Sequence, residues 1–276
     1  MKVAYVGIDL LYPALPALEE AGCELMRIFT CDTDNVTEFN TRVVGFAERR
    51  GIPLQKTRVT AADLEALVSQ GCELLLCGGY YYKIPVRDDL CMVNIHPSPL
   101  PVGRGAWPMP VTILRGLGES GVTFHKLTPE MDAGDILLQE KLAVSPDETL
   151  ETLSEKQRAL LPGMVRRLVS ALPELWNNAV PQDEARAEYW ACPTEADWTI
   201  REEMPPEKID RILRAFYGYE VIYENRAGER WELIEARLAD CPDREKLCLS
   251  CGDRVIIAGS ARRMNQQPPG IYGRII

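Results

Sequence analysis

The chain has 276 residues, of which 46% are hydrophobic and 26% are charged, as in an ordinary folded globular protein. Its net charge of −10 argues against a large nucleic-acid interface, because phosphate groups favour a basic surface. No stretch approaches the roughly 18 uncharged apolar residues of a membrane helix, and the first residues have the pattern of a strand rather than an export signal. We therefore expect a cytoplasmic protein with no membrane partner.

Strands and helices alternate in the first part of the chain. Apolar runs predict strands at 2–8, 23–30, 52–57 and 72–79. Apolar residues at helical spacing predict helices at 13–21, at 37–51 and, after a Thr60 cap, at 61–71. This alternation is typical of a parallel sheet with helices on both faces, so we predict a Rossmann-like α/β fold.

The middle of the chain continues this pattern, with strands predicted at 92–95, 121–128 and 136–144. A helix is predicted at 107–115. A long helical region at 145–176 contains Pro162, which lacks an N–H and should kink or break the helix.

The composition changes near residues 177–193, and a different pattern follows. A helix is predicted at 205–216, and short alternating strands follow it at 219–224, 230–238, 246–251, 254–259 and 272–276. We therefore predict two domains: an α/β domain at 1–186 and a small β-rich domain, similar to an OB fold or a partial barrel, at 187–276.

The nine cysteines do not form a metal-binding pattern. Cys248 and Cys251 make one C-x-x-C pair, but residues three apart on a strand point to opposite faces. No second pair has the spacing of metal ligands. We expect most of these thiols to be buried, and we expect no metal.

Asn94 and His96 stand where the strand at 92–95 should end, and the chain has only two histidines. Histidine is the side chain best suited to moving a proton near neutral pH. Asn94 can donate a hydrogen bond to an oxyanion, and Asp132 can orient the imidazole and raise its pKa. Because ligands of open α/β sheets bind beyond the carboxyl ends of strands, we expect the loops after 72–79 and 92–95 and the turn with Asp132 at that edge.

This set of residues fits direct attack by an amine or water on a carbonyl carbon, because no Ser or Cys nucleophile stands in a recognisable elbow. The residues alone leave a second reading open, in which His96 is a loop residue bonded to backbone and Asn94 is paired in the sheet. His125 alternates with apolar neighbours, and we expect it to be a packed or edge residue.

Two motifs carry a resemblance to a known family: NIHPSPLPVGRGAWP, from Asn94, and GVTFHKLTPEMDAGDIL, from Gly121. In order and spacing they resemble the folate-dependent formyltransferase family, whose pattern is roughly N-x-H-x-S-L-L-P, an R-G, G-V-T and D-x-G. The similarity extends from residue 1 to about residue 240. It implies N10-formyltetrahydrofolate as the formyl donor and a primary amine as the acceptor.

The resemblance also implies roles for matched positions. His96 would transfer the proton, Asn94 would stabilise the oxyanion, and Asp132 would tune His96 and support a proton-relaying water. Arg104 would either bind an anion of the acceptor or cap its loop. The positions implied to bind the folate are Tyr81, Tyr82, Lys83, Ile84, Pro85, Ser98, Pro99, Leu100, Pro101, Thr128, Pro129, Glu130 and Met131.

The chain departs from the family pattern around Ser98. The family usually has a small residue or Pro after the His and Leu-Leu after the Ser, and here these positions are Pro97 and Pro99-Leu100. Proline fixes φ and has no N–H, so this loop should be stiffer and lack one backbone donor at Pro99. The departure leaves Asn94, His96 and Asp132 in place, but it puts contacts to folate or to the acceptor in doubt.

Two segments favour a small-molecule amine over tRNA as the acceptor. Residues 78–85 and 33–53 resemble loops of amino-sugar formyltransferases rather than the Gly/Arg/Lys-rich loop of the tRNA enzymes. We therefore expect a nucleotide-linked amino sugar, with methionyl-tRNA as the alternative, since a β-rich domain after the linker is also the layout of the tRNA enzymes. A formyltetrahydrofolate hydrolase and a non-catalytic folate-binding protein are lesser alternatives.

Overall fold

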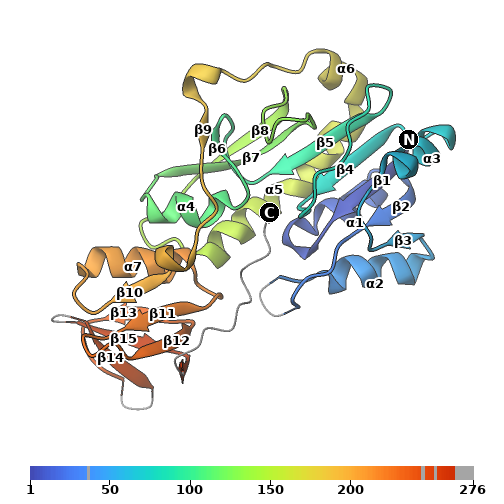
Figure 1. Ribbon diagram of the computed structural model, residues 1–276. Coiled ribbons are helices and arrows are strands. Elements are labelled where there is room, and N and C mark those ends of the chain that lie inside the picture. Colours follow the sequence, from blue (N-terminus) through green and yellow to red (C-terminus); the bar gives the residue numbers. More distant parts are fainter. Residues whose placement is uncertain (36–37, 244–245, 252–253, 265–276) are drawn as a thin grey trace. The chain divides into compact units, whose positions relative to one another are not determined.

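Figure 1 shows the computed structural model, which describes residues 1–35, 38–243, 246–251 and 254–264. The strand predicted at 272–276 lies outside these residues. The chain divides into two compact units. The first contains Met1–Gly105, Gly121–Leu142 and Lys156–Tyr189, and the second contains Ala106–Ser120, Ala143–Glu155 and the described residues from Trp190 onward.

The first unit is built around a seven-stranded sheet with the order β3-β2-β1-β4-β5-β7-β8 (Figure 1). Neighbouring strands from β3 to β5 are parallel, whereas β7 is antiparallel to β5. This confirms the predicted Rossmann-like α/β fold. The strands are β1 (Lys2–Gly7), β2 (Glu24–Phe29), β3 (Leu54–Gln55), β4 (Leu74–Gly78), β5 (Cys91–His96), β7 (Glu119–Lys126) and β8 (Ile136–Ala143).

Two apolar clusters lie on the two faces of this sheet. In β1, Val3 and Tyr5 belong to the larger cluster, and Ala4 and Val6 belong to the smaller one. This division follows from the alternation of side chains along a strand. Helices α1, α2 and α5 supply apolar residues to the larger cluster, and α3 supplies them to the smaller one.

Local signals explain where the helices begin. The predicted cap Thr60 accepts a hydrogen bond from the Asp63 N–H, and the Asp63 carboxylate accepts one from the Thr60 N–H in return. At the start of α2, the Asp9 carboxylate accepts bonds from the N–H groups of Arg42 and Val43. The helices of this unit are α1 (Ala14–Glu20), α2 (Thr41–Arg50), α3 (Ala61–Ser69), α5 (Leu150–Ser170) and α6 (Leu172–Asn177).

Of the kink or break predicted at Pro162, the break is wrong, because α5 continues through this residue. Proline removes its own N–H donor, and this weakens the helix locally. On either side, however, Leu161 and Val165 are fully buried in the larger cluster. Packing of the apolar face of a helix supplies most of its stability in a folded protein, so it outweighs the local loss here.

The second unit confirms a β-rich C-terminal region. Its sheets have the orders β10-β11-β12-β16 and β13-β15-β14. Its elements are α4 (Pro108–Leu114), α7 (Pro206–Ala215), β10 (Thr199–Arg201), β11 (Val221–Glu224), β12 (Arg230–Ile234), β13 (Arg237–Ala239), β14 (Leu247–Cys251), β15 (Arg254–Ala258) and β16 (Ser260–Arg263). Every helix within the described ranges is too short or too polar to cross a membrane.

Gly134 occupies the tightest point of the turn between β7 and β8, and this generates a test of the fold. A Cβ at this position would lie 2.0 Å from the Lys126 carbonyl oxygen. We expect Gly134→Ala to displace the turn and to lower the free energy of unfolding by about 1–3 kcal/mol, measured by chemical denaturation. The control is Gly163→Ala in α5, where a Cβ meets no atom within 4 Å and should be neutral or stabilising. Wild-type stability of the Gly134 variant would contradict this account.

Candidate active site

Asn94 and His96 point to the same face of β5, because they are two residues apart on the strand. Met92, two residues earlier on this face, packs in the smaller apolar cluster with residues of α3. Toward the end of the strand, polar contacts from the loop 97–105 and the turn 127–135 replace this apolar packing. The candidate site lies where apolar packing along β5 gives way to these polar contacts.

His96 is nearly buried, with 5% of its surface exposed. Its Nε2 lies 2.8 Å from the carbonyl oxygen of Gly103. Since a carbonyl oxygen can only accept, Nε2 carries the proton and the neutral ring presents the lone pair of Nδ1. Nδ1 lies 3.6 Å from Oδ1 of Asp132, which is an ion-pair distance rather than a hydrogen bond. Catalytic contacts of this kind often tighten only when substrate binds.

Asp132 reaches His96 from a turn that leaves the sheet at the other end of β5. Because β7 is antiparallel to β5, the N–H of Leu127 bonds to the carbonyl oxygen of Met92, early in β5. The prediction that this turn stands at the carboxyl edge is therefore wrong, and Asp132 arrives because the turn folds back. Its φ is 53°, and its Oδ2 accepts a hydrogen bond from the Gly105 N–H at 2.9 Å.

His125 is the site residue that the sequence reading misses. It stands directly opposite Asn94 in the register of β5 and β7 and is 1% exposed. Its Nε2 lies 3.1 Å from Nδ2 of Asn94 and 3.6 Å from Oδ1 of Asp132. Its Nδ1 faces the Lys126 carbonyl oxygen at 2.8 Å, so Nδ1 carries the proton and Nε2 accepts from the Asn94 amide. The second N–H of that amide can donate to a ligand.

Burial sets the net charge state of this site. It lowers the pKa of His96, because the charged ring loses its hydration, and the nearby Asp132 and the bond to Gly103 only partly offset this. The contribution of Asp132 has the predicted direction, because it raises the pKa of His96, but burial outweighs it. Burial alone would raise the pKa of Asp132, but the two imidazoles and the Gly105 N–H lower it to about 2. At neutral pH a neutral His96 faces an ionised Asp132.

Three acceptor atoms converge in this arrangement: Nδ1 of His96, Nε2 of His125 and Oδ1 of Asp132. In the tautomers assigned above, no proton lies between these three atoms. A proton placed on Nδ1 of His96 would be stabilised by the carboxylate beside it. The geometry is therefore suited to take up one proton, and the second N–H of the Asn94 amide is of the type that can donate to an oxyanion.

The predicted folate-binding positions 81–85 follow β4 and lie in a loop that aromatic side chains hold in place. The rings of Tyr80 and Tyr82 pack edge to face with centroids 5.5 Å apart, and the guanidinium of Arg58 lies 4.2 Å from the Tyr82 centroid. Ile84 packs against the smaller apolar cluster. Tyr81 and Pro85 are half-buried, and Lys83 is exposed.

The other predicted folate positions fall into buried and exposed groups. Ser98 is fully buried and donates to the Val102 carbonyl oxygen at 2.8 Å, so it shapes its loop from inside. Leu100 and Pro101 are also buried, and Pro99 is half-buried. In the turn, Thr128 donates to the Glu130 carbonyl oxygen at 2.8 Å, and Pro129, Glu130 and Met131 are exposed.

Arg104 makes its side-chain contacts with other residues of this unit. Its side chain is 1% exposed, and its guanidinium bonds to Gln182 and Glu184. Of the two roles expected from the sequence, loop anchoring fits these contacts. Among the described residues, no group of three or more His, Cys, Asp or Glu side chains is arranged to hold a metal ion.

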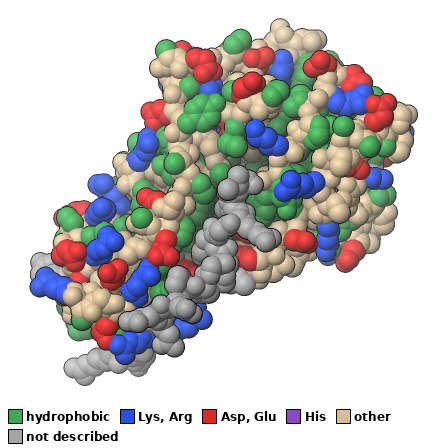
Figure 2. Space-filling view, in the orientation of Figure 1, with side chains coloured by type: hydrophobic (Ala, Val, Ile, Leu, Met, Phe, Trp, Pro, Cys, Tyr) green, Lys and Arg blue, Asp and Glu red, His purple; other side chains and the backbone are tan. Residues whose placement is uncertain are grey.

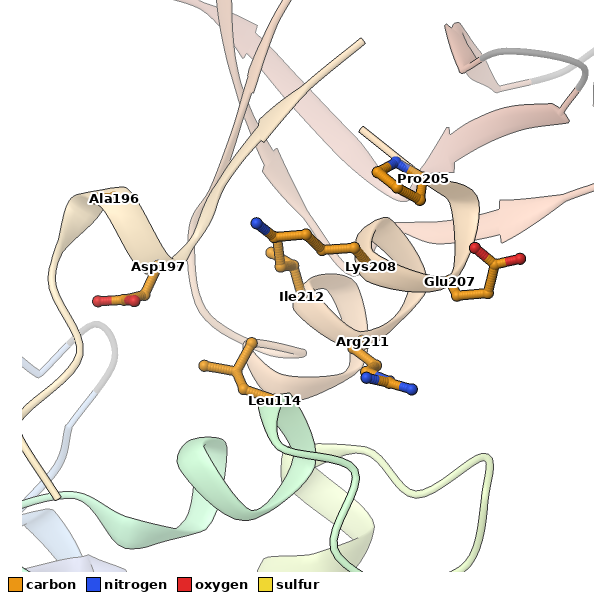
Figure 3. Close-up of a pocket in the computed structure, with 8 residues that line it drawn as sticks. All are labelled: Leu114, Ala196, Asp197, Pro205, Glu207, Lys208, Arg211 and Ile212. Atoms are coloured by element: carbon orange, nitrogen blue, oxygen red, sulfur yellow. The ribbon is translucent and has the colours of Figure 1, made fainter. Parts of the chain in front are cut away.

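Figure 3 shows a pocket of about 510 Å³ in the second unit, lined by none of the predicted site residues. Its walls include Lys208 and Arg211 from α7, and Asp197, whose carboxylate already accepts a bond from the Thr194 N–H. The complete lining is Leu114, Ala196, Asp197, Pro205, Glu207, Lys208, Arg211 and Ile212.

Comparisons with known proteins agree with this geometry. A family model described as formyl transferase matches residues 55–168. The methionyl-tRNA formyltransferase of Anaplasma marginale is 33% identical over 276 residues, covering 94% of this chain and 90% of that protein. The methionyl-tRNA formyltransferase of Moorella thermoacetica is 28% identical over 291 residues, covering 98% and 92%.

The fold is also shared with a solved structure. WlaRD, a sugar 3N-formyl transferase solved in the presence of dTDP and 5-N-formyl-THF, has a TM-score of 0.67 and 17% identity. The match covers 97% of this chain and 99% of WlaRD. Because the sequence match to formyltransferases spans nearly the whole length of both chains, this chain is a formyltransferase and belongs to the folate-dependent formyltransferase family.

Proposed function

We propose that the protein transfers the formyl group of N10-formyltetrahydrofolate to the primary amine of a small acceptor, such as a nucleotide-linked amino sugar. The observation that supports it most is the convergence of Asn94, His96 and Asp132, with Oδ1 of Asp132 3.6 Å from Nδ1 of His96. The site lies within residues 1–186, which we propose as the catalytic domain, with 187–276 as a second domain.

The proposed chemistry assigns one task to each side chain. Asn94 donates through Nδ2 to the formyl oxygen as the amine attacks and the oxygen becomes negative. His96, neutral at the start, takes the amine proton directly or through a water, and the Asp132 carboxylate stabilises the resulting imidazolium. The same proton is then given to N10 as the carbon–N10 bond breaks. The net result is a formamide and tetrahydrofolate.

Three segments are proposed to hold the folate: the loop 81–85, the loop 98–101 and the turn 128–131. The relative WlaRD was solved with 5-N-formyl-THF, which supports a reduced folate as the donor. Because several of these side chains are buried in internal contacts, we propose that the loops offer mainly backbone groups to the pterin.

An acidic loop supports the small acceptor over tRNA. Between β2 and α2 the chain carries Asp32, Asp34 and Glu38, and residues 31–41 contain no Lys or Arg. A polyanion needs Lys and Arg contacts to its phosphates. Figure 2 shows acidic and basic side chains interspersed on the face in view, without a large patch of Lys and Arg.

Methionyl-tRNA is the second candidate acceptor. The observation that favours it is the sequence match to methionyl-tRNA formyltransferases of Anaplasma marginale and Moorella thermoacetica over nearly the whole chain.

Removal of the proposed catalytic groups gives the first test. We expect His96→Ala and Asn94→Ala each to lower kcat/KM for formyl transfer by about 100-fold or more, with the melting temperature retained. The control is Asn178→Ala, an exposed asparagine whose amide bonds to the Glu174 carbonyl oxygen. Near-normal turnover in either site variant would refute the mechanism.

The pH dependence tests the role of the Asp132 charge. In the wild type the pKa of His96 is lowered, so this base should still be neutral somewhat below the ordinary histidine pKa of about 6.5. We therefore expect kcat/KM to stay high at that pH and to fall only at lower pH. Asp132→Asn removes the negative charge that raises the pKa of His96, so the acid limb should move to still lower pH while kcat falls. Asp135→Asn is the matched control, because Asp135 lies in the same turn as Asp132 but pairs with Lys126 of β7. If the acid limb of Asp132→Asn lay at the same pH as that of the wild type, the Asp132 charge would not control the protonation of His96.

A panel of acceptors tests the substrate class. The protein would be assayed with N10-formyltetrahydrofolate and either nucleotide-linked amino sugars or charged methionyl-tRNA, and the formylated product would be identified by mass spectrometry. We expect turnover of at least one amino sugar, and any activity on tRNA should fall steeply with added salt. Turnover of methionyl-tRNA alone would establish the second candidate and exclude the first.

A further inference from the structure

The tripeptide Gly103–Arg104–Gly105 supports two catalytic side chains at once. The carbonyl oxygen of Gly103 accepts a hydrogen bond from Nε2 of His96 at 2.8 Å, and the N–H of Gly105 donates to Oδ2 of Asp132 at 2.9 Å. These two bonds come from opposite ends of one short segment, β6 (Val102–Arg104) and the residue after it. A shift of this segment would therefore displace the partners of both side chains together.

The side chain of Arg104 anchors this tripeptide to a distant part of the chain. Its Nε and Nη2 donate to Oε1 of Gln182 at 3.1 and 2.9 Å. Its Nη1 and Nη2 donate to the two carboxylate oxygens of Glu184 at 3.0 and 2.6 Å, in a bidentate pair that fixes direction as well as distance. The ring of Tyr189 lies 5.3 Å from the guanidinium carbon.

Gln182 also holds the other catalytic loop. Its Nε2 donates to the carbonyl oxygens of Asp132 and Gly134 at 2.7 and 2.8 Å. The side-chain amide of Gln182 therefore joins the two loops, because its oxygen accepts from Arg104 and its nitrogen donates to the turn. Asp132 has a positive φ, a conformation that persists only when the surroundings over-determine it.

The segment that carries Gln182 and Glu184 is itself fastened at both ends. Before it, Val180 pairs with Ile136 at the start of β8. After it, β9 (Glu188–Tyr189) pairs with β6, and the Tyr189 hydroxyl donates to the Met131 carbonyl oxygen at 3.2 Å. The segment therefore contacts both the tripeptide and the turn.

We infer that residues 182–189 act as a clasp that positions His96 and Asp132 for formyl transfer, with Gln182 and Arg104 as its positioning residues. The inference rests on the proposed function of those two catalytic side chains. Neither positioning residue touches the reacting atoms. Each acts through backbone groups that hold the imidazole and the carboxylate at their working separation.

The variant Gln182→Glu tests the clasp with little change of size. It keeps an acceptor for Arg104 but removes both donors to the turn, so Asp132 should move from His96. Since a displacement of about 1 Å can cost about 100-fold in rate, we expect kcat to fall by about 10- to 100-fold with KM for both substrates little changed. The acid limb of the pH profile should move to lower pH.

A second readout does not require turnover. The pKa of His96, followed by NMR of the imidazole in the substrate-free protein, should fall in the variant, because Asp132 is the group that raises it. The other titratable group facing His96 is His125, and its resonances would be assigned in parallel. A segment that only stabilises the fold would lower the melting temperature and leave this pKa unchanged.

Controls separate the clasp from folding and from the proposed function. Gln182→Met adds no charge and replaces the Glu variant if the latter fails to fold, with the same outcomes expected. Arg167→Met removes an exposed Arg–Glu pair with Glu140 in the same unit and should leave kcat and the His96 pKa unchanged. A folded Gln182 variant with wild-type kcat, pH profile and His96 pKa overturns the clasp. An active His96→Ala overturns the proposed function instead.

Discussion

A carboxylate that must stay charged in a nearly closed site is the constraint on which this structure depends. The Asp132 side chain is 11% exposed, and an ion removed from water is expensive unless other groups replace its hydration. The Gly105 N–H bonds one carboxylate oxygen, and the other oxygen faces two ring nitrogens, where an added proton would stabilise it. The left-handed backbone of Asp132 and the absence of a side chain at Gly134 are both needed to bring the carboxylate to these partners.

The same closure gives His96 its chemical character. Loss of hydration favours the neutral ring, and the carboxylate favours the charged one, and in the resting site the first effect is larger. A base that is neutral at rest but lies beside a fixed negative charge can take up a proton during a reaction, because the carboxylate stabilises the charged ring. In the proposed transfer of a formyl group between two nitrogens, such a group would return to the second nitrogen the proton that it takes from the first.

Much of this could be predicted from the sequence, because the information is local. The alternation of strands and helices gave the sheet, and the spacing of Asn94 and His96 placed both on one face. The role of His125 could not be predicted, because it depends on which residue of β7 stands opposite Asn94, and register is a property of paired strands. The predicted position of the Asp132 turn is wrong because it depends on the direction of β7 relative to β5, which is likewise a property of paired strands. Of the kink or break predicted at Pro162, the break does not occur, because buried neighbours decide helix continuity there.

The two histidines of the chain have opposite tautomers, each fixed by a backbone carbonyl: His96 carries its proton on Nε2 and His125 on Nδ1. Neither ring can exchange tautomers without losing that bond. The dipoles of both rings are therefore oriented before any substrate arrives. In a site of this kind the energy of reorganising the surroundings has already been provided by folding.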